Sequence, residues 1–182
     1  RLTANVILAH LLYPQAFGLL ALAYTFMVGL MLFSDLGVRT SIMQSPRGDE
    51  PAFLDTAWVL QIGRGFALGL GACLLAWPAA YWRPQPEPEL LWLLPLIGVS
   101  SVLDGFISMK LLTLQRHLAQ KKAVLIEVLT QTTGVGTTIV WTLIDPGPFA
   151  LAMGPIAQSL MKVLASHSLL PGHRDRLAWD RA

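Results

Sequence analysis

The 182-residue sequence has few charged residues and only one cysteine. Charged residues make up 13% of the chain, whereas soluble domains contain roughly 25%. The single cysteine, Cys73, excludes an internal disulfide framework and a cysteine metal cage, and we interpret it as a small buried hydrophobe. The net charge of +2 is too small to favour nucleic-acid binding. These absences exclude a soluble nucleic-acid-binding protein and a disulfide-bonded scaffold.

The motifs of common enzymes are also missing from the sequence. It contains no phosphate-binding P-loop, no nucleophile elbow and no zinc-ligand helix, and its carboxylates are not spaced for acid/base catalysis. Its four histidines are scattered without metal-ligand spacing. We therefore expect no catalytic activity, no metal and no cofactor.

Long apolar runs dominate what is present, and hydrophobic residues make up 54% of the chain. The run from Phe17 to Ser34 has no formal charge. As a helix rising about 1.5 Å per residue it reaches roughly 27 Å, close to the thickness of a hydrocarbon core. We predict an all-α, polytopic membrane helix bundle, with residues 1–182 forming a single transmembrane lobe. The predicted helices cover residues 1–12, 17–34, 56–82, 90–114, 123–144 and 149–170.

The two ends of the sequence suggest a longer protein. The first predicted helix is about 18 Å long before the Tyr13-Pro14 break, too short to span a bilayer of about 30 Å. We expect that this helix has lost its N-terminal part. The polar run from Pro171 to Ala182 resembles a loop that leads to further chain.

Glycine and proline residues punctuate the predicted helices. Residues 45–55 contain two prolines and a glycine and are expected to form a polar loop. Gly65 and Gly69 are expected to permit close contact between helices. Gly154-Pro155 is expected to interrupt the last predicted helix.

The basic residues of the loops predict the orientation of the bundle. Nine lie in the loops on one side, and only Arg83 lies on the other. By the positive-inside rule the basic side is cytoplasmic, which also places the N-terminus in the cytoplasm. The nine residues are Arg39, Arg47, Lys110, Arg116, Lys121, Lys122, Arg174, Arg176 and Arg181.

Several ionisable residues fall within the predicted spans, where an isolated charge is costly. Arg64 lies about 12 Å along its helix, and Gln61 shares its face one turn earlier. We interpret this pair as a polar lining, and the alternative is an arginine that snorkels or is held by a structural partner. Arg1 in the first helix is a further candidate.

Two later helices each carry a polar stripe. Glu127 and Gln131 begin one stripe, which continues through Gly134 and Thr138. On the last helix, Gly154, Gln158 and Lys162 follow the same spacing. The stripes are expected to enclose a polar cavity between the two helices, or else to serve helix association through hydrogen bonds and small residues.

The carboxylates of the spans have two interpretations. Asp104 and Glu127 either pair with Arg64 or Lys162, or bind a coupling proton or cation. Simple charge compensation is the favoured interpretation. Asp35 is expected to pair with Arg39 at a helix end.

Several segments, in order, resemble a known family. The pieces Phe17-Gly18, FSDLG at 33–37 and TAWVLQIGRGF at 56–66 are similar to the N-terminal part of bacterial oligosaccharide flippases, the polysaccharide transporter family of the MOP superfamily. Later pieces, LLTLQRHLAQKKAVLIEV at 111–128 and LMKVLASHSLLPGHRDRLAWD at 160–180, fit the same pattern. The resemblance covers essentially the whole chain.

The resemblance implies a fold, a cargo and a location. It implies one of two MATE-like lobes around a central cavity, in a multi-pass protein of the bacterial inner membrane. Such a protein moves lipid-linked oligosaccharide, on a polyprenyl pyrophosphate carrier, from the cytoplasmic to the periplasmic leaflet for polysaccharide and lipopolysaccharide biosynthesis. An anionic headgroup needs cations at depth, for which Arg64, Lys162 and Arg1 are candidates, with Gln61 and Gln158 beside them.

Other functions are compatible with the same features. One is a MOP-type exporter of another cargo, and a second is a noncatalytic membrane scaffold of a polysaccharide assembly complex. A third is an envelope glycan ligase or polymerase, which the short outer links disfavour. The expected partners are the lipid-linked oligosaccharide, membrane lipids and other membrane proteins of polysaccharide assembly, and no nucleic acid.

Overall fold

The described part of the chain is entirely helical in the computed structural model. It comprises residues 14–34, 42, 45, 47, 49–82, 86–116, 120–170 and 175–177, and within these residues there are helices and no strands. The prediction of an all-α fold is confirmed. The helices are α2 (Pro14–Phe33), α4 (Pro51–Tyr81), α5 (Leu90–Gly105), α6 (Lys110–Arg116), α7 (Gln120–Ile144) and α8 (Pro148–Ser168).

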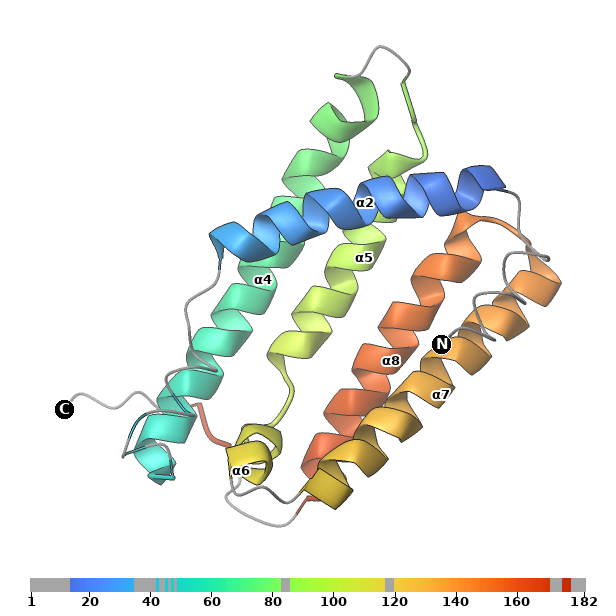
Figure 1. Cartoon of the computed structure of the whole chain (residues 1–182). Helices are drawn as coiled ribbons and strands as arrows, with labels where there is room; N and C mark the ends of the chain where they lie inside the picture. The colour runs from blue at the N-terminus through green and yellow to red at the C-terminus, as the bar shows by residue number, and fades with distance from the viewer. Residues whose placement is uncertain are drawn as a thin grey trace.

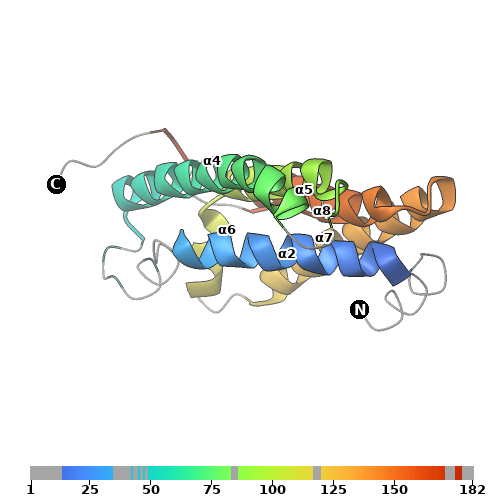
Figure 2. The same cartoon turned by 90° about the horizontal axis from the view of Figure 1, so that it is seen from above.

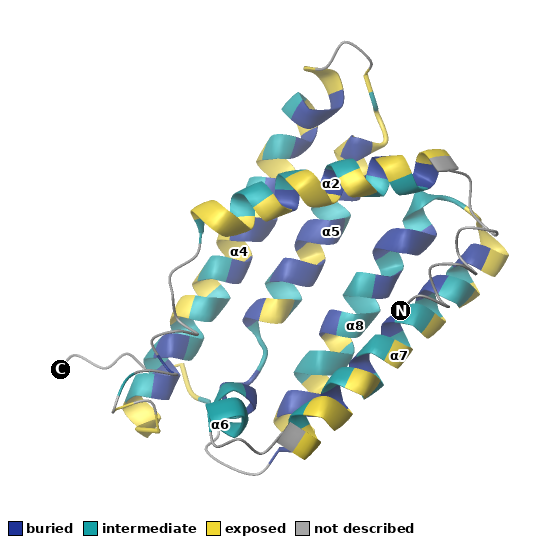
Figure 3. Cartoon of the chain, viewed as in Figure 1, coloured by how far each residue is buried: buried dark blue, intermediate teal, exposed yellow. Residues whose placement is uncertain are grey.

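Four of the helices form one layer. Helices α4, α5, α8 and α7 lie side by side in that order, and α2 crosses one face of the layer (Figure 1). The view from above places α2 on that face along its whole length (Figure 2). In the middle of the layer half of the residues of α5 are buried, whereas exposed residues are spread along α2, α4 and α7 (Figure 3). The short helix α6 lies at the end of the layer where α4 begins.

The helix lengths agree with a membrane bundle. Helices α2, α4, α7 and α8 are each long and apolar enough to cross a membrane. Helices α5 and α6 together satisfy the same test as a fifth span, although they are bent by 67° relative to one another. The predicted first span, residues 1–12, lies outside the described residues.

The predicted helix at residues 90–114 is wrong in one respect, because the backbone breaks in the middle of it. Helix α5 ends at Gly105, and α6 starts only at Lys110. The hydroxyl of Ser108 accepts a hydrogen bond from the backbone N–H of Lys110 at 3.3 Å, as residues that begin helices do. Partners from distant parts of the chain also hold the break, and these are described below.

Three further predictions differ from the structure: the start of α4, the break in α8 and the burial of Cys73. Helix α4 begins at Pro51 within the predicted loop 45–55, because proline suits the first helical position, where no amide hydrogen is needed. Helix α8 runs unbroken through Gly154-Pro155, since Gly154 packs directly against α7. Cys73 is exposed rather than buried, because it lies on the outer face of α4.

Glycine allows α4 and α5 to approach closely, as predicted for Gly65 and Gly69. A Cβ atom added to Gly65 would lie 2.9 Å from the carbonyl oxygen of Ser101, and one added to Gly69 would lie 2.6 Å from a methyl group of Val102. The facing Gly98 and Gly105 on α5 are crowded as well, with the nearest atoms 2.9 and 3.1 Å from an added Cβ. Backbones packed at this distance leave no room for larger side chains.

The two ends of the bundle differ in chemistry. At one end aromatic rings contact each other, Trp77 with Tyr81 at 6.1 Å and Trp141 with Phe149 at 5.3 Å between ring centroids. Such rings are typical of a membrane–water interface. The opposite end, called the basic end here, carries described basic residues near α6 and the start of α7. They include Arg47, Lys110, Arg116, Lys121, Lys122 and Arg176.

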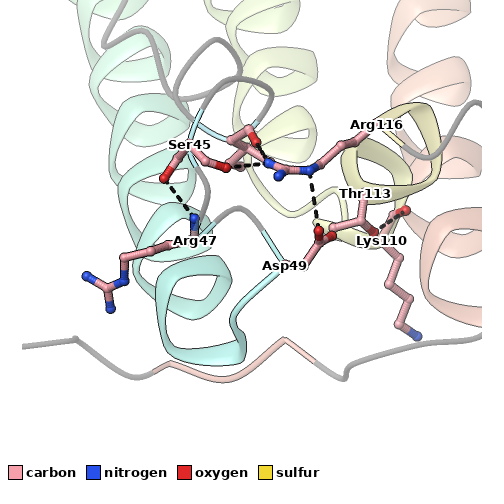
Figure 4. A network of polar contacts seen from close by, with 7 residues as sticks. Ser45, Arg47, Asp49, Lys110, Thr113 and Arg116 are labelled. Carbon is pink, nitrogen blue, oxygen red and sulfur yellow. Dashed lines mark hydrogen bonds and ion pairs between the residues drawn. The ribbon is translucent and has the colours of Figure 1, made fainter.

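Arg116 ties the basic end together. Its guanidinium donates hydrogen bonds to the carbonyl oxygens of Ile42 and Ser45, and its Nε lies 3.3 Å from the carboxylate of Asp49 (Figure 4). These contacts attach α6 to the segment that leads into α4. Arg116 is therefore a structural residue as well as a contributor to the charge of this end.

Candidate functional site

A polar cavity of about 290 Å³, called the central cavity here, opens between α2, α4, α5, α6 and α8. Four of the predicted site residues line it together. They are Gln61 and Arg64 on α4, Asp104 on α5 and Lys162 on α8. Two cations and one carboxylate therefore face one hollow in an otherwise apolar bundle.

Arg64 both lines the cavity and closes the end of a helix. Its Nε donates to the carbonyl oxygen of Ser34 at 2.9 Å, and another guanidinium nitrogen is 3.5 Å from the carbonyl oxygen of Met31. The last carbonyl groups of a helix lack partners within the helix and carry partial negative charge, which a cation stabilises. The structural partner considered as an alternative for Arg64 is thus the C-terminus of α2.

Gln61 also has a partner within the protein. Its side-chain amide donates to the carbonyl oxygens of Asp104 at 3.0 Å, Gly105 at 3.3 Å and Ile107 at 3.3 Å. These carbonyl groups belong to the last turn of α5 and the break that follows it. Gln61 therefore stabilises the end of α5 while its side chain forms part of the cavity wall.

Lys162 forms an ion pair with Glu127 across α7 and α8. Its ammonium nitrogen lies 3.6 Å from a Glu127 carboxylate oxygen. Gln131 donates a hydrogen bond of 2.9 Å to the other oxygen of Glu127. The predicted pairing of Glu127 with one of the cations is confirmed, and Gln131 orients the carboxylate.

Asp104 faces the same cation from the other side. Its carboxylate interacts electrostatically with Lys162 and accepts a hydrogen bond from the hydroxyl of Ser159. Lys162 thus interacts with two carboxylates, as an ion pair with Glu127 on α7 and electrostatically with Asp104 on α5. This arrangement agrees with charge compensation and leaves the coupling of Asp104 to an ion as a prediction.

Gln158 lies at a helix contact rather than in the wall of the central cavity. A Cβ atom on Gly134 would lie 3.0 Å from the Cβ of Gln158, and Gly154 packs against Thr138. These small residues bring α7 and α8 into direct contact along this stretch. The charged members of the two stripes, Glu127 and Lys162, line a second cavity that is described below. The central cavity lies towards α4 and α5.

The break between α5 and α6 is fixed by residues that the sequence analysis did not identify. His167 places its Nε2 2.9 Å from the carbonyl oxygen of Phe106, and Ser166 accepts a hydrogen bond of 3.1 Å from the N–H of Ser108. Asp175 accepts hydrogen bonds from the hydroxyl of Ser108 and from the N–H of Met109. The local sequence signal for a new helix here is Ser108, because serine is a common residue at the start of a helix.

Some predicted residues lie outside the described part of the chain. These include the candidate cavity residue Arg1, the predicted pair Asp35 and Arg39, and Arg83 in the outer link. Among the described residues, no group of three or more His, Cys, Asp or Glu side chains is arranged to hold a metal ion.

Comparison with known sequences identifies the family. Residues 7–182 match the polysaccharide biosynthesis protein family. Neither the comparison with curated proteins nor that with solved structures gave a match. The family match agrees with the resemblance of the sequence to the N-terminal part of polysaccharide transporters, and the helices agree with a multi-pass membrane protein. The chain therefore belongs to the polysaccharide biosynthesis protein family.

Proposed function

We propose that this chain is one lobe of a transporter that moves lipid-linked oligosaccharide between the leaflets of the bacterial inner membrane. The carrier is a polyprenyl pyrophosphate, and the direction is from the cytoplasmic to the periplasmic leaflet. The anionic headgroup occupies the central cavity while the polyprenyl tail stays in lipid. Alternating access of two lobes around the cavity carries the headgroup across.

One observation carries this proposal: Arg64 and Lys162 line the same cavity although they come from opposite parts of the chain. A pyrophosphate is costly to bring into an apolar bundle without cations, and a guanidinium matches phosphate oxygens particularly well. Arg64 already donates some of its hydrogen bonds to the end of α2, and Lys162 already forms an ion pair with Glu127. A headgroup can bind the remaining N–H donors of both side chains, or replace these contacts with contacts to phosphate.

The charges at the basic end support the proposed orientation. Lys110, Arg116, Lys121 and Lys122 lie at the end of the bundle opposite the aromatic rings. We place this end in the cytoplasm, in accord with the positive-inside rule. A periplasm-active reporter enzyme inserted after Glu87 should be active, and one inserted after Lys121 should be inactive. The reverse pattern would contradict this orientation.

Transport in vesicles tests the function. The whole protein is reconstituted and given a fluorescent polyprenyl-pyrophosphate sugar in one leaflet. The wild type should move the label to the other leaflet, and Arg64→Ala and Lys162→Ala should each slow it by about tenfold, as expected for the loss of one charge-assisted contact with phosphate. Leu74→Ala, on the exposed face of α4, serves as the control. Wild-type rates in both cavity variants would contradict the proposal.

A noncatalytic scaffold is the second candidate, because three of the polar side chains already have partners within the protein. Arg64, Gln61 and Lys162 contact a helix end, a helix break and a carboxylate, respectively. A scaffold would retain its assembly partners while moving no lipid-linked sugar in vesicles.

Transport of a cationic drug instead of the sugar would favour the exporter of another cargo, with Asp104 as its site.

A further inference from the structure

A second cavity of about 290 Å³, called the side cavity here, lies between α6, α7 and α8. It shares three wall residues with the central cavity, namely Leu111, Gln115 and Lys162. Because the two cavities have these side chains in common, they are neighbours separated by a single layer of residues. The charged member of that layer is Lys162.

The walls of the two cavities differ in chemistry. The side of the side cavity formed by α7 consists of Ala123, Val124 and Ile126, followed by Glu127. Val124 is 58% exposed although it lies on a membrane-spanning helix, and its neighbours Leu125 and Val128 are exposed as well. An apolar wall that continues onto an exposed apolar helix face is suited to hydrocarbon chains.

The position of the side cavity along the bundle is also informative. It lies at the start of α7, where Lys121 and Lys122 are exposed, and so at the basic end. Basic residues at this level attract the phosphates of a membrane surface. A lipid that approaches here meets first exposed lysines, then an apolar wall, and then the ammonium of Lys162.

We propose that the side cavity is the inlet through which a long-chain lipid phosphate enters the central cavity from the leaflet at the basic end. The inference rests on the proposed transport function and specifies where its substrate enters. The phosphate passes between α6 and α7 towards Arg64, and the hydrocarbon chain remains against Ala123 and Val124. The ion pair of Lys162 and Glu127 separates the two cavities and acts as the gate between them.

The geometry of this ion pair allows it to separate when a phosphate arrives. The separation of 3.6 Å is longer than a strong charge-assisted hydrogen bond, and both side chains are partly exposed. An arriving phosphate competes with Glu127 for Lys162. Gln131 donates to Glu127 from the same helix, so the released carboxylate keeps a partner on α7.

Photolabelling of the reconstituted whole protein tests the inlet. The probe is hexadecyl phosphate with a diazirine on the chain close to the phosphate, in phosphatidylcholine vesicles. The label should concentrate on residues 123–126, and inorganic pyrophosphate should reduce it there severalfold by occupying the central cavity. Labelling around Val140 should not respond, because Val140 is also 58% exposed on α7 but does not line the side cavity.

A matched pair of variants blocks the inlet or leaves it open. Val124→Trp should abolish most of the phosphate-dependent labelling and most of the transport, whereas Val140→Trp should retain both. If transport persists in Val124→Trp and pyrophosphate has no local effect, the inlet is wrong and the transport function stands. If labelling behaves as expected but the wild type moves no lipid-linked sugar, the inlet stands and the transport function fails. Should Val124→Trp misfold, the pyrophosphate effect on the wild type decides alone.

Discussion

The Nε of Arg64 lies 2.9 Å from the carbonyl oxygen of Ser34, so a cation on α4 closes the C-terminal end of α2. The same arginine lines the central cavity with Lys162. The wall of the cavity and the end of α2 therefore share one side chain. We expect a phosphate that binds Arg64 to compete with the end of α2 for its guanidinium.

Replacing Arg64 should affect both stability and transport. Arg64→Ala removes the charge-assisted hydrogen bonds at the end of α2 and should lower the free energy of unfolding by about 1–2 kcal/mol. Arg64→Lys keeps the charge without the forked geometry of the guanidinium. Its stability and transport rate should lie between those of the wild type and Arg64→Ala. Thermal unfolding in detergent measures the stability. The control is Arg47→Ala, which removes an exposed pair with Glu50 and should change stability by less than about 1 kcal/mol. Equal melting temperatures for Arg64→Ala and Arg47→Ala would contradict the capping role.

Replacing Gln61 with a residue that only accepts hydrogen bonds should destabilise the protein. Gln61→Glu places a carboxylate against three carbonyl oxygens and should cost about 1–3 kcal/mol of unfolding free energy. Gln61→Met keeps the size without the donor or the repulsion and should be less harmful. Gln15→Glu, at the exposed start of α2, should be neutral. Melting temperatures in the order wild type, Gln61→Met, Gln61→Glu are expected, and a Gln61→Glu protein as stable as the wild type would refute the interpretation.

A charge exchange separates the two roles of Lys162. The double variant Glu127→Lys with Lys162→Glu retains an ion pair between α7 and α8 but moves the cation out of the wall of the central cavity. Its melting temperature should lie between those of the single variants and the wild type, because the pair with position 127 is kept but the new carboxylate at position 162 meets Asp104. Transport should remain impaired. Each single variant should be less stable than the double variant because it brings like charges together. Transport restored by the exchange would mean that Lys162 acts only as a structural partner.

Two glycines on α4 should respond in opposite ways to the same substitution. Gly65→Ala inserts a methyl group 2.9 Å from the carbonyl oxygen of Ser101 and should destabilise the protein by about 1–3 kcal/mol. Gly63→Ala meets no atom within 4 Å and should stabilise the helix by about 0.5–1 kcal/mol. Thermal unfolding of the two variants side by side measures the difference. A similar effect of both substitutions would show that α4 and α5 are not packed through Gly65.

The sequence alone determined the class of the protein and most of its spans. Length and hydrophobicity of a run are local properties, so α2, α7 and α8 were predicted within a few residues of their ends. The close approach at Gly65 and Gly69 was also predictable, because small residues four positions apart on a membrane helix form a surface on which another helix can pack closely. Arg64 and Lys162 could be singled out because a charge in lipid requires a partner.

The tertiary structure decided where those polar groups meet. The contact of Arg64 with the end of α2, and that of Gln61 with the end of α5, depend on the crossing of helices that hydropathy does not encode. The break after Gly105 is held by Gln61, His167 and Asp175, which lie far from it in the chain. Backbone groups freed by a broken helix must find partners, and only the folded arrangement supplies them.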